Sequence, residues 1–201
     1  KFLKPKKPFF FILGGAKLET KLPLIKRYLP AAFSIFVGGA LANSFFKAKG
    51  YEMGKSIVGK PSPDLKVLLK NKKILLPADV KTLFGDTVFP EDLSPKDKIV
   101  DIGPITLVEL KRKILGAKSV LFNGPVGIYN EGFGSGTEEI LKLLAKSRAE
   151  IVLGGGDTLA IVSKLKLENK FSFVSTAGGA MLGFLAEGTL PGIEALKKSK
   201  N

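Results

Sequence analysis

Residues 9–15 read FFFILGG, an apolar run of five residues that ends in two glycines. No polar residue interrupts Phe9–Leu13, so neither face of this segment would meet water. A run of that length without alternation is typical of a strand in a parallel sheet that is covered on both faces. The glycine pair indicates a tight turn at the carboxyl end of the strand.

The same unit, a buried strand followed by an amphipathic helix, recurs along the chain. Further apolar runs predict strands at residues 32–37, 73–76, 119–122, 151–153 and 171–174. Helical periodicity occurs at residues 19–29, 40–48, 62–71, 104–115, 137–147, 157–164 and 179–187. This order predicts an α/β fold with a doubly wound (Rossmann-like) parallel sheet, in which helices cover both faces and make three αβα layers.

Glycine follows nearly every predicted strand. These glycines are Gly14-Gly15, Gly38-Gly39, Gly124, Gly154-Gly155-Gly156 and Gly178-Gly179. Because the carboxyl ends of parallel strands share one edge, the turns would line one rim of the sheet. Backbone N–H groups beside a missing Cβ can approach a phosphate or a purine ring closely, and helix N-termini favour anions. Close packing of helix on sheet is the alternative reason for glycine, especially at Gly38 and Gly39.

The composition restricts the chemistry. The 201 residues include no Cys and no His, which excludes thiol nucleophiles, disulfides, zinc sites and imidazole acid-base catalysis. The net charge is +14, and residues 1–30 hold eight basic residues against Glu19 alone, which directs attention to anionic partners. The chain opens with Lys1 and shows no signal-peptide pattern, so we expect a fragment or a processed product.

Two glycine motifs resemble phosphate-binding fingerprints but fail on spacing. Residues 50–56 have three residues between the glycines where a P-loop needs four, and they follow a predicted helix. Gly132, Gly134 and Gly136 do not make a dinucleotide-binding turn, because the position for its third glycine is Thr137. Neither motif is a candidate site.

Longer strings resemble phosphoglycerate kinase. They are LGGAK (13–17), NGPVG (123–127), GGGDT (154–158) and STAGGA (175–180), within a likeness that covers residues 5–196. Each string alone is weak, but their combination in this order is specific. The resemblance implies that residues 1–201 are the nucleotide-binding C-terminal domain of a two-domain kinase. The family's N-terminal half, which binds the phosphoglycerate, has no counterpart in this sequence.

The resemblance implies a role for each matching residue. Lys17 would stabilise the phosphoryl group in transit and Lys21 would hold the nucleotide phosphates, and their spacing places them on one face of a helix. Asp157 would bind Mg²⁺, with an N-cap role as the alternative. Gly178 and Gly179 would donate amides to the transferring phosphoryl oxygens. The other implied nucleotide contacts are Gly14, Gly15, Gly38, Gly39, Asn123, Gly124, Pro125, Asn130, Glu131, Gly154, Gly155, Gly156 and Thr158.

Four positions depart from the family pattern. Thr20 stands where an acidic residue usually precedes the second lysine, and Asn130, followed by Glu131, replaces the glutamate that holds the ribose hydroxyls. Ile99 and Ala177 each replace a glycine. The changes affect ribose contact and the shape of the adenine pocket. Asn130 can hydrogen-bond a hydroxyl, but without the strength of a charged acceptor.

The implied activity is reversible phosphoryl transfer between 1,3-bisphosphoglycerate and ADP, giving 3-phosphoglycerate and ATP, with Mg²⁺ as cofactor. Such a transfer needs positioning and positive charge, which lysines and backbone amides supply without Cys or His. The chain alone would bind MgADP or MgATP but be catalytically silent, because the acceptor site lies on the other domain of the family. We expect a cytoplasmic, glycolytic monomer with no nucleic-acid or membrane partner.

Two other functions stay open. The charge of +14 suits a nucleic-acid-binding module, although the aromatic run at residues 9–11 lies in a buried strand and no nucleic-acid motif is present. A non-catalytic nucleotide-binding remnant would share every motif described above. Salt-sensitive oligonucleotide binding without ATP binding would indicate the first. Failure to gain activity when the other domain is added in trans would indicate the second.

Overall fold

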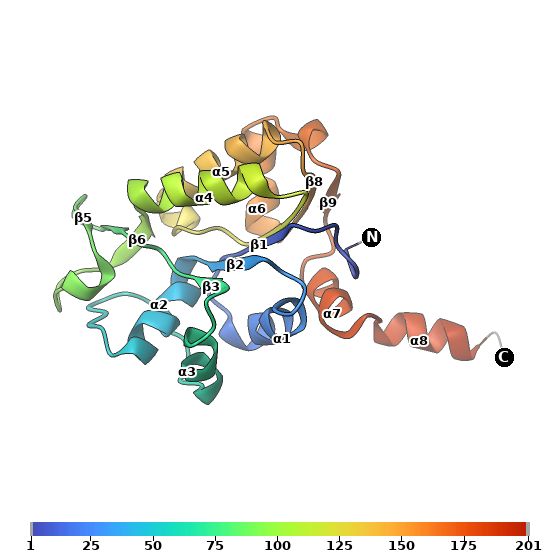
Figure 1. The fold of residues 1–201 in the computed structure, drawn as a ribbon, viewed down its shortest axis with the longest axis horizontal. Helices are drawn as coiled ribbons and strands as arrows, with labels where there is room; N and C mark the ends of the chain where they lie inside the picture. Colours follow the sequence, from blue (N-terminus) through green and yellow to red (C-terminus); the bar gives the residue numbers. More distant parts are fainter. Residues whose placement is uncertain (1, 200–201) are drawn as a thin grey trace.

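The computed structural model describes residues 2–199 as a six-stranded sheet between two layers of helices (Figure 1). All neighbouring strands in this sheet are parallel. The strands are β1 (Phe9–Leu13), β2 (Ser34–Val37), β3 (Ile74–Leu75), β7 (Ser119–Asn123), β8 (Glu150–Gly154) and β9 (Phe173–Ser175). The predicted strands and the three-layer α/β fold are therefore confirmed.

The strand order creates a switch point between β1 and β7. The sheet runs β3-β2-β1-β7-β8-β9, so the chain builds outward from β1 to β3 and later outward from β7 to β9. In such sheets the ligand crevice lies at the carboxyl ends of the strands where the direction reverses. Leu13 is paired with Asn123, the last residue of each strand. The turns that follow β1 and β7 therefore start side by side.

The seven predicted helices are present, and each begins and ends close to the expected residue. They are α1 (Leu18–Tyr28), α2 (Gly39–Lys49), α3 (Pro63–Leu69), α4 (Pro104–Gly116), α5 (Ser135–Ala145), α6 (Gly156–Lys164) and α7 (Gly179–Glu187). Figure 1 shows α1, α2, α3 and α7 on one face of the sheet and α4, α5 and α6 on the other. Among residues 2–199, no helix combines the length and the apolar character needed to cross a membrane.

Strand β1 explains why the sheet needs both helical layers. Phe9, Phe11 and Leu13 belong to the apolar core shared with α1, α2, α3 and α7. Phe10 and Ile12 belong to the second core, shared with α4, α5 and α6. All five side chains are fully buried. Burying each of them stabilises the fold by about 1.5–3 kcal/mol, which is why an uninterrupted apolar run suits this strand.

The sequence patterns did not predict a second, antiparallel sheet or a last helix. The sheet has the order β5-β4-β6 and consists of β5 (Thr87–Val88), β4 (Val80–Thr82) and β6 (Ile99–Ile102). Helix α8 spans Pro191–Lys198, and short 3-10 turns lie at Pro90–Asp92, Tyr129–Glu131 and Glu168–Lys170. The strands β4, β5 and β6 are too short, and β4 and β6 are each interrupted by a charged residue, so they give no periodic signal in the sequence.

Candidate functional site

The turns after β1, β2 and β7 are joined by backbone hydrogen bonds at the carboxyl rim of the sheet. The Gly15 N–H donates to the Pro125 carbonyl oxygen at 2.8 Å. The turn after β2 joins them, because the Gly39 N–H donates to the Val126 carbonyl oxygen at 3.1 Å. Three glycine segments that are far apart in the sequence thus share one edge of the sheet.

Close packing against neighbouring backbone and side-chain atoms favours glycine at several of these positions. A Cβ on Gly14 would overlap the Pro125 carbonyl oxygen, and one on Gly38 would lie 2.8 Å from Cγ1 of Val126. Gly39 has a φ of +62°, in the left-handed region, and a Cβ there would lie 2.9 Å from the Gly15 nitrogen. The packing alternative is therefore sufficient to explain glycine at Gly38 and Gly39.

Other glycines lie in open space. Gly156 and Gly179 are the first residues of α6 and α7, and no heavy atom lies within 4 Å of a Cβ built on either. Neither residue has a left-handed φ. Alanine would favour a helix more than glycine does, so nothing in the described part of the chain accounts for glycine at these two positions. Gly178 is equally open, but its φ of +49° favours glycine by itself.

Lys21 and Asn123 form a buried pair below the turns. The Lys21 ammonium donates to Oδ1 of Asn123, and these residues are 7% and 1% exposed. Burial lowers the pKa of Lys21 to about 8. The Nδ2 of Asn123 has no hydrogen-bond partner among residues 2–199, and it lies 3.1 Å from the position of a Cβ on Gly154. The pair thus places a cation and a free amide donor beside the turn after β8.

Lys17 has a different environment from Lys21. It is exposed and immediately precedes the first residue of α1. Thr20, at the position where the family pattern has an acidic residue, donates its hydroxyl to the Lys17 carbonyl oxygen at 3.0 Å. Lys17 is therefore free to move toward a ligand, whereas Lys21 is held in place by its surroundings.

The turn from β8 into α6 carries the predicted metal ligand. Gly155, with a φ of +100°, is the N-cap residue of α6, and Asp157 lies in the first turn of the helix. The N-cap interpretation of Asp157 is therefore wrong. The carboxylate is exposed, and no hydrogen bond or ion pair engages it within the described chain. Thr158 is buried instead, and its Oγ1 accepts from the Gly124 N–H at 3.1 Å, which ties the turns after β7 and β8 together.

A small crevice of about 160 Å³ opens between these turns. Five of the predicted residues line it: Gly15, Gly39, Pro125, Asn130 and Asp157. Gly14, Lys17, Lys21, Gly38, Asn123, Gly124, Glu131, Gly154, Gly155, Gly156, Thr158, Gly178 and Gly179 do not line this crevice. Glu131 pairs with Lys98 at 2.7 Å. A larger hollow of about 690 Å³ lies elsewhere, along β9, α7 and α8, and its lining is mainly apolar.

The sequence analysis missed several residues of the crevice. They are Ala16, Ala40, Asn43, Ile57, Gly127, Ile128 and Tyr129. The Nδ2 of Asn43 donates to the Ile57 carbonyl oxygen at 2.9 Å, while its buried Oδ1 has no partner in the described chain. Ala16 belongs to the LGGAK string and Gly127 to the NGPVG string, but no sequence signal marked the other positions, because single apolar or amide residues are not specific to any ligand.

The fold and the crevice define the class of the molecule: a doubly wound α/β protein with a crevice at the carboxyl ends of its parallel strands, where such folds bind ligands. Within this class, the chain belongs to the phosphoglycerate kinase family. The family model described as "Phosphoglycerate kinase" matches residues 1–188.

Relatives and solved structures agree with this assignment. The phosphoglycerate kinases of Mycoplasmoides gallisepticum and Clostridium botulinum are 39% and 40% identical to this chain in sequence, and each match covers 96% of the chain. The phosphoglycerate kinase structure from Coxiella burnetii has a TM-score of 0.87 and a sequence identity of 34%, and it covers 98% of this chain. The phosphoglycerate kinase structure from Pyrococcus horikoshii has a TM-score of 0.81 and a sequence identity of 31%, and it covers 96% of this chain. The chain spans about half the length of these proteins, between 51% and 54%.

Proposed function

We propose that this chain is the nucleotide-binding C-terminal half of a phosphoglycerate kinase. Its rim would bind MgADP or MgATP for reversible phosphoryl transfer between 1,3-bisphosphoglycerate and ADP, giving 3-phosphoglycerate and ATP in glycolysis. The observation that carries the proposal is the convergence at one rim of glycine turns, a buried lysine and an exposed carboxylate from distant parts of the chain.

The crevice at Gly15, Gly39 and Asn130 suits the nucleoside end of the ligand. Glycine turns present flat backbone surfaces, against which a purine ring can lie. Asn130 is exposed at the mouth and can donate to or accept from a ribose hydroxyl. Its amide supplies a weaker bond than a carboxylate would. We assign the adenine to the glycine side of the crevice and the ribose to Asn130.

The phosphates would extend toward the starts of α1, α6 and α7. The N-termini of these helices attract anions through their free N–H groups and their dipoles. Lys21 is buried at a cost in solvation, which an anionic phosphate would offset. Lys17 is exposed and can follow the transferring phosphoryl group. Gly178 and Gly179 would direct their amides at its oxygens, because the space beside their Cα atoms is open to a ligand.

The residues present fit a magnesium ion that arrives with the nucleotide. The Asp157 carboxylate is exposed at the rim, and residues 2–199 contain no group of three or more acidic, His or Cys side chains that could hold a metal ion. Mg²⁺ commonly takes one or two carboxylates and completes its shell with phosphates and water. Asp157 would hold the ion, which when bound supplies charge neutralisation to the phosphates.

Isothermal titration with MgADP tests the proposal. We expect binding by the unsubstituted chain, and a loss of affinity of at least about tenfold in Lys21→Ala and in Asp157→Ala, since each removes a charge at the phosphates. Lys26→Ala and Asp64→Ala are matched controls, because these residues pair with each other at 2.9 Å on the surface of α1 and α3. Affinity unchanged in both site variants would contradict the assignment.

Activity would require the partner half. Adding a phosphoglycerate-binding domain of the same family in trans should give ATP formation from 1,3-bisphosphoglycerate, whereas the chain alone should give none. Nucleotide binding without any activity in this assay would favour a non-catalytic remnant instead.

A further inference from the structure

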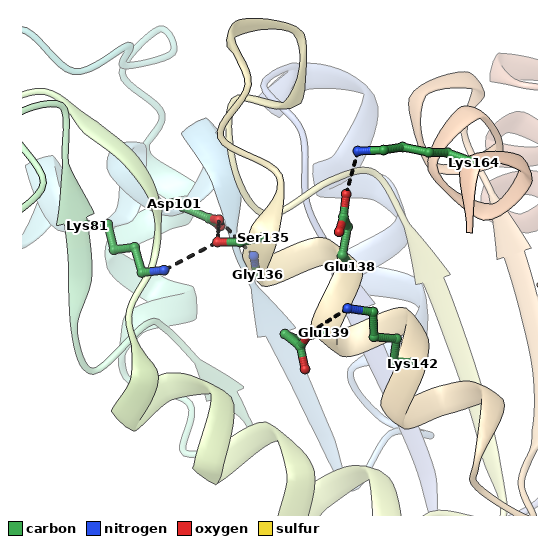
Figure 2. A network of polar contacts seen from close by, with 8 residues as sticks. All are labelled: Lys81, Asp101, Ser135, Gly136, Glu138, Glu139, Lys142 and Lys164. Atoms are coloured by element: carbon green, nitrogen blue, oxygen red, sulfur yellow. Dashed lines mark hydrogen bonds and ion pairs between the residues drawn. The ribbon is translucent and has the colours of Figure 1, made fainter.

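Asp101 is a buried carboxylate outside the candidate crevice. It lies in β6 and is 2% exposed. Its Oδ2 accepts from the Gly136 N–H at 2.8 Å and from the Ser135 hydroxyl at 3.1 Å, while Oδ1 accepts from the Ile102 N–H at 2.9 Å. Ser135 and Gly136 begin α5 (Figure 2), so a residue of the small sheet holds the N-terminus of a helix of the main domain.

One wall of the crevice is formed by Gly127–Asn130, and only residues 131–134 separate this segment from the start of α5 at Ser135. A Cβ on Gly127 would lie 2.6 Å from Oδ1 of Asp101, so the start of the wall packs against the carboxylate itself. The Ile128 N–H donates to the Val100 carbonyl oxygen at 2.8 Å, next to Asp101 in β6. The wall and β6 therefore touch at two consecutive residues of each.

The far end of the wall depends on the start of α5. A Cβ on Gly134 would lie 2.5 Å from Cδ2 of Tyr129, so the tyrosine ring rests on the residue that precedes the helix. Lys164 of α6 lies 5.9 Å above the same ring and pairs with Glu138 of α5 at 2.9 Å (Figure 2). Moving the first turn of α5 would therefore move the support of Tyr129, which lines the crevice together with Asn130.

A carboxylate is suited to this position, because it accepts several N–H and O–H donors at once and favours the positive end of a helix dipole. Lys81 of β4 adds positive charge nearby and donates to the Ser135 hydroxyl at 3.3 Å. Desolvation by burial nevertheless raises the pKa of Asp101. A buried acid that the apolar core does not need is typical of residues that fix a specific geometry.

We propose that Asp101 is a positioning residue for the nucleotide site, which acts by anchoring the start of α5 and thereby holding the Gly127–Asn130 wall against the base and ribose. The inference rests on the proposed function for the identity of the ligand. It adds a residue outside the crevice whose substitution should alter nucleotide affinity more than its effect on stability explains.

The chain provides a matched control in Asp79. This aspartate is 1% exposed and accepts from the Ile105 N–H at 3.0 Å and the Thr106 N–H at 2.8 Å, at the start of α4. It therefore holds the start of a helix as Asp101 does, from the residue that immediately precedes β4 of the small sheet. None of the residues that line the crevice comes from α4, so Asp79 shares the structural role without the proposed functional one.

The experiment compares Asp101→Asn, Asp79→Asn and the unsubstituted chain by titration with MgADP and by thermal unfolding. Both variants should lower the melting temperature. We expect Asp101→Asn to weaken binding by about tenfold, and Asp79→Asn to leave the affinity within about twofold. Amide hydrogen exchange of residues 127–136, measured by NMR without nucleotide, should accelerate in Asp101→Asn alone.

Ser135→Ala keeps the Asp101 carboxylate and removes one of its hydrogen-bond donors. It is the second variant for the same comparison, to be used if Asp101→Asn does not fold. Its expected effect is about threefold on the affinity. The role of Asp101 would be overturned by unchanged affinity in Asp101→Asn, or by equal losses of affinity in the Asp101 and Asp79 variants. If Asp101→Asn does not fold, unchanged affinity in Ser135→Ala would overturn it. Absence of MgADP binding by the unsubstituted chain would instead overturn the proposed function, before any variant is compared.

Discussion

The turns after β1 and β7 and the turns that begin α6 and α7 carry similar glycine runs in very different surroundings. Around Gly14 and Gly124 the backbones touch, and an added Cβ would overlap a neighbouring carbonyl group. Around Gly156 and Gly179 there is open space. We call the turns around Gly14 and Gly124 the closed turns and those around Gly156 and Gly179 the open turns. In the closed turns the fold itself requires glycine, whereas in the open turns only something outside the described chain could require it. Packing thus explains glycine in one region, whereas in the other region we propose that close approach of a ligand explains it.

The largest expected effect tests the closed turns. Gly14→Ala places a methyl group against the Pro125 carbonyl oxygen, a backbone atom that cannot turn away. We expect a loss of at least about 3 kcal/mol in the free energy of unfolding, since overpacking of a rigid site is costly. Urea denaturation followed by circular dichroism measures it. Gly156→Ala is the control and should gain about 0.4–1 kcal/mol; similar losses in both variants would remove the distinction between the two regions.

The second prediction concerns the charge buried under the closed turns. The pKa of Lys21 is about 8 in the folded chain and 10.5 as the ordinary value, so between these pH values the unfolded chain binds more protons. The free energy of unfolding should therefore rise with pH across this window, by on the order of 3 kcal/mol from this residue. Lys21→Met should remove that rise, as measured by urea denaturation at pH 7.5 and 10.5. Lys26→Met, on the exposed side of α1, should retain it; a rise that persists in Lys21→Met would show that Lys21 is not its source.

The smallest effect tests the open turns. Gly156→Ala and Gly179→Ala should each weaken MgADP or MgATP binding by about three- to tenfold, because the added methyl group blocks close approach of a phosphate to the helix N-terminus. Neither substitution should lower stability. Gly192→Ala is the matched control, since Gly192 is also an open glycine in the first turn of a helix. Titration decides: affinity that is equal in all three variants would mean that the open turns do not face the ligand.

Much of the fold could be predicted from the sequence because its strands are buried on both faces. Such strands appear as plain apolar runs, as Phe9–Leu13 does. The small sheet could not be predicted in the same way, because β5 has two residues and β6 contains Asp101. That carboxylate is satisfied by Gly136 at the start of α5, which lies 35 residues further along the chain. A local pattern cannot show such a contact.

The candidate site divides in a similar way. Its glycine turns were visible because each follows a strand, and strand ends in a parallel sheet meet at one edge. The burial of Lys21 against Asn123 and the pairing of Glu131 with Lys98 depend on side chains that meet only after folding. Asn43, Ile57 and Tyr129 carried no signature of their own, because their role comes from the walls to which their backbones bring them.

The central sheet separates two apolar interiors, and this separation has a consequence for any molecule held at its rim. Lys21 and Gly179 belong to helices of one interior, while Asp157 and the segment before α5 belong to the other. A single nucleotide that contacts both sets would link the two helical layers that pack on opposite faces of the sheet. Loss of either layer would then cost the whole of the binding free energy, so the ligand would make the melting of the two layers one cooperative event.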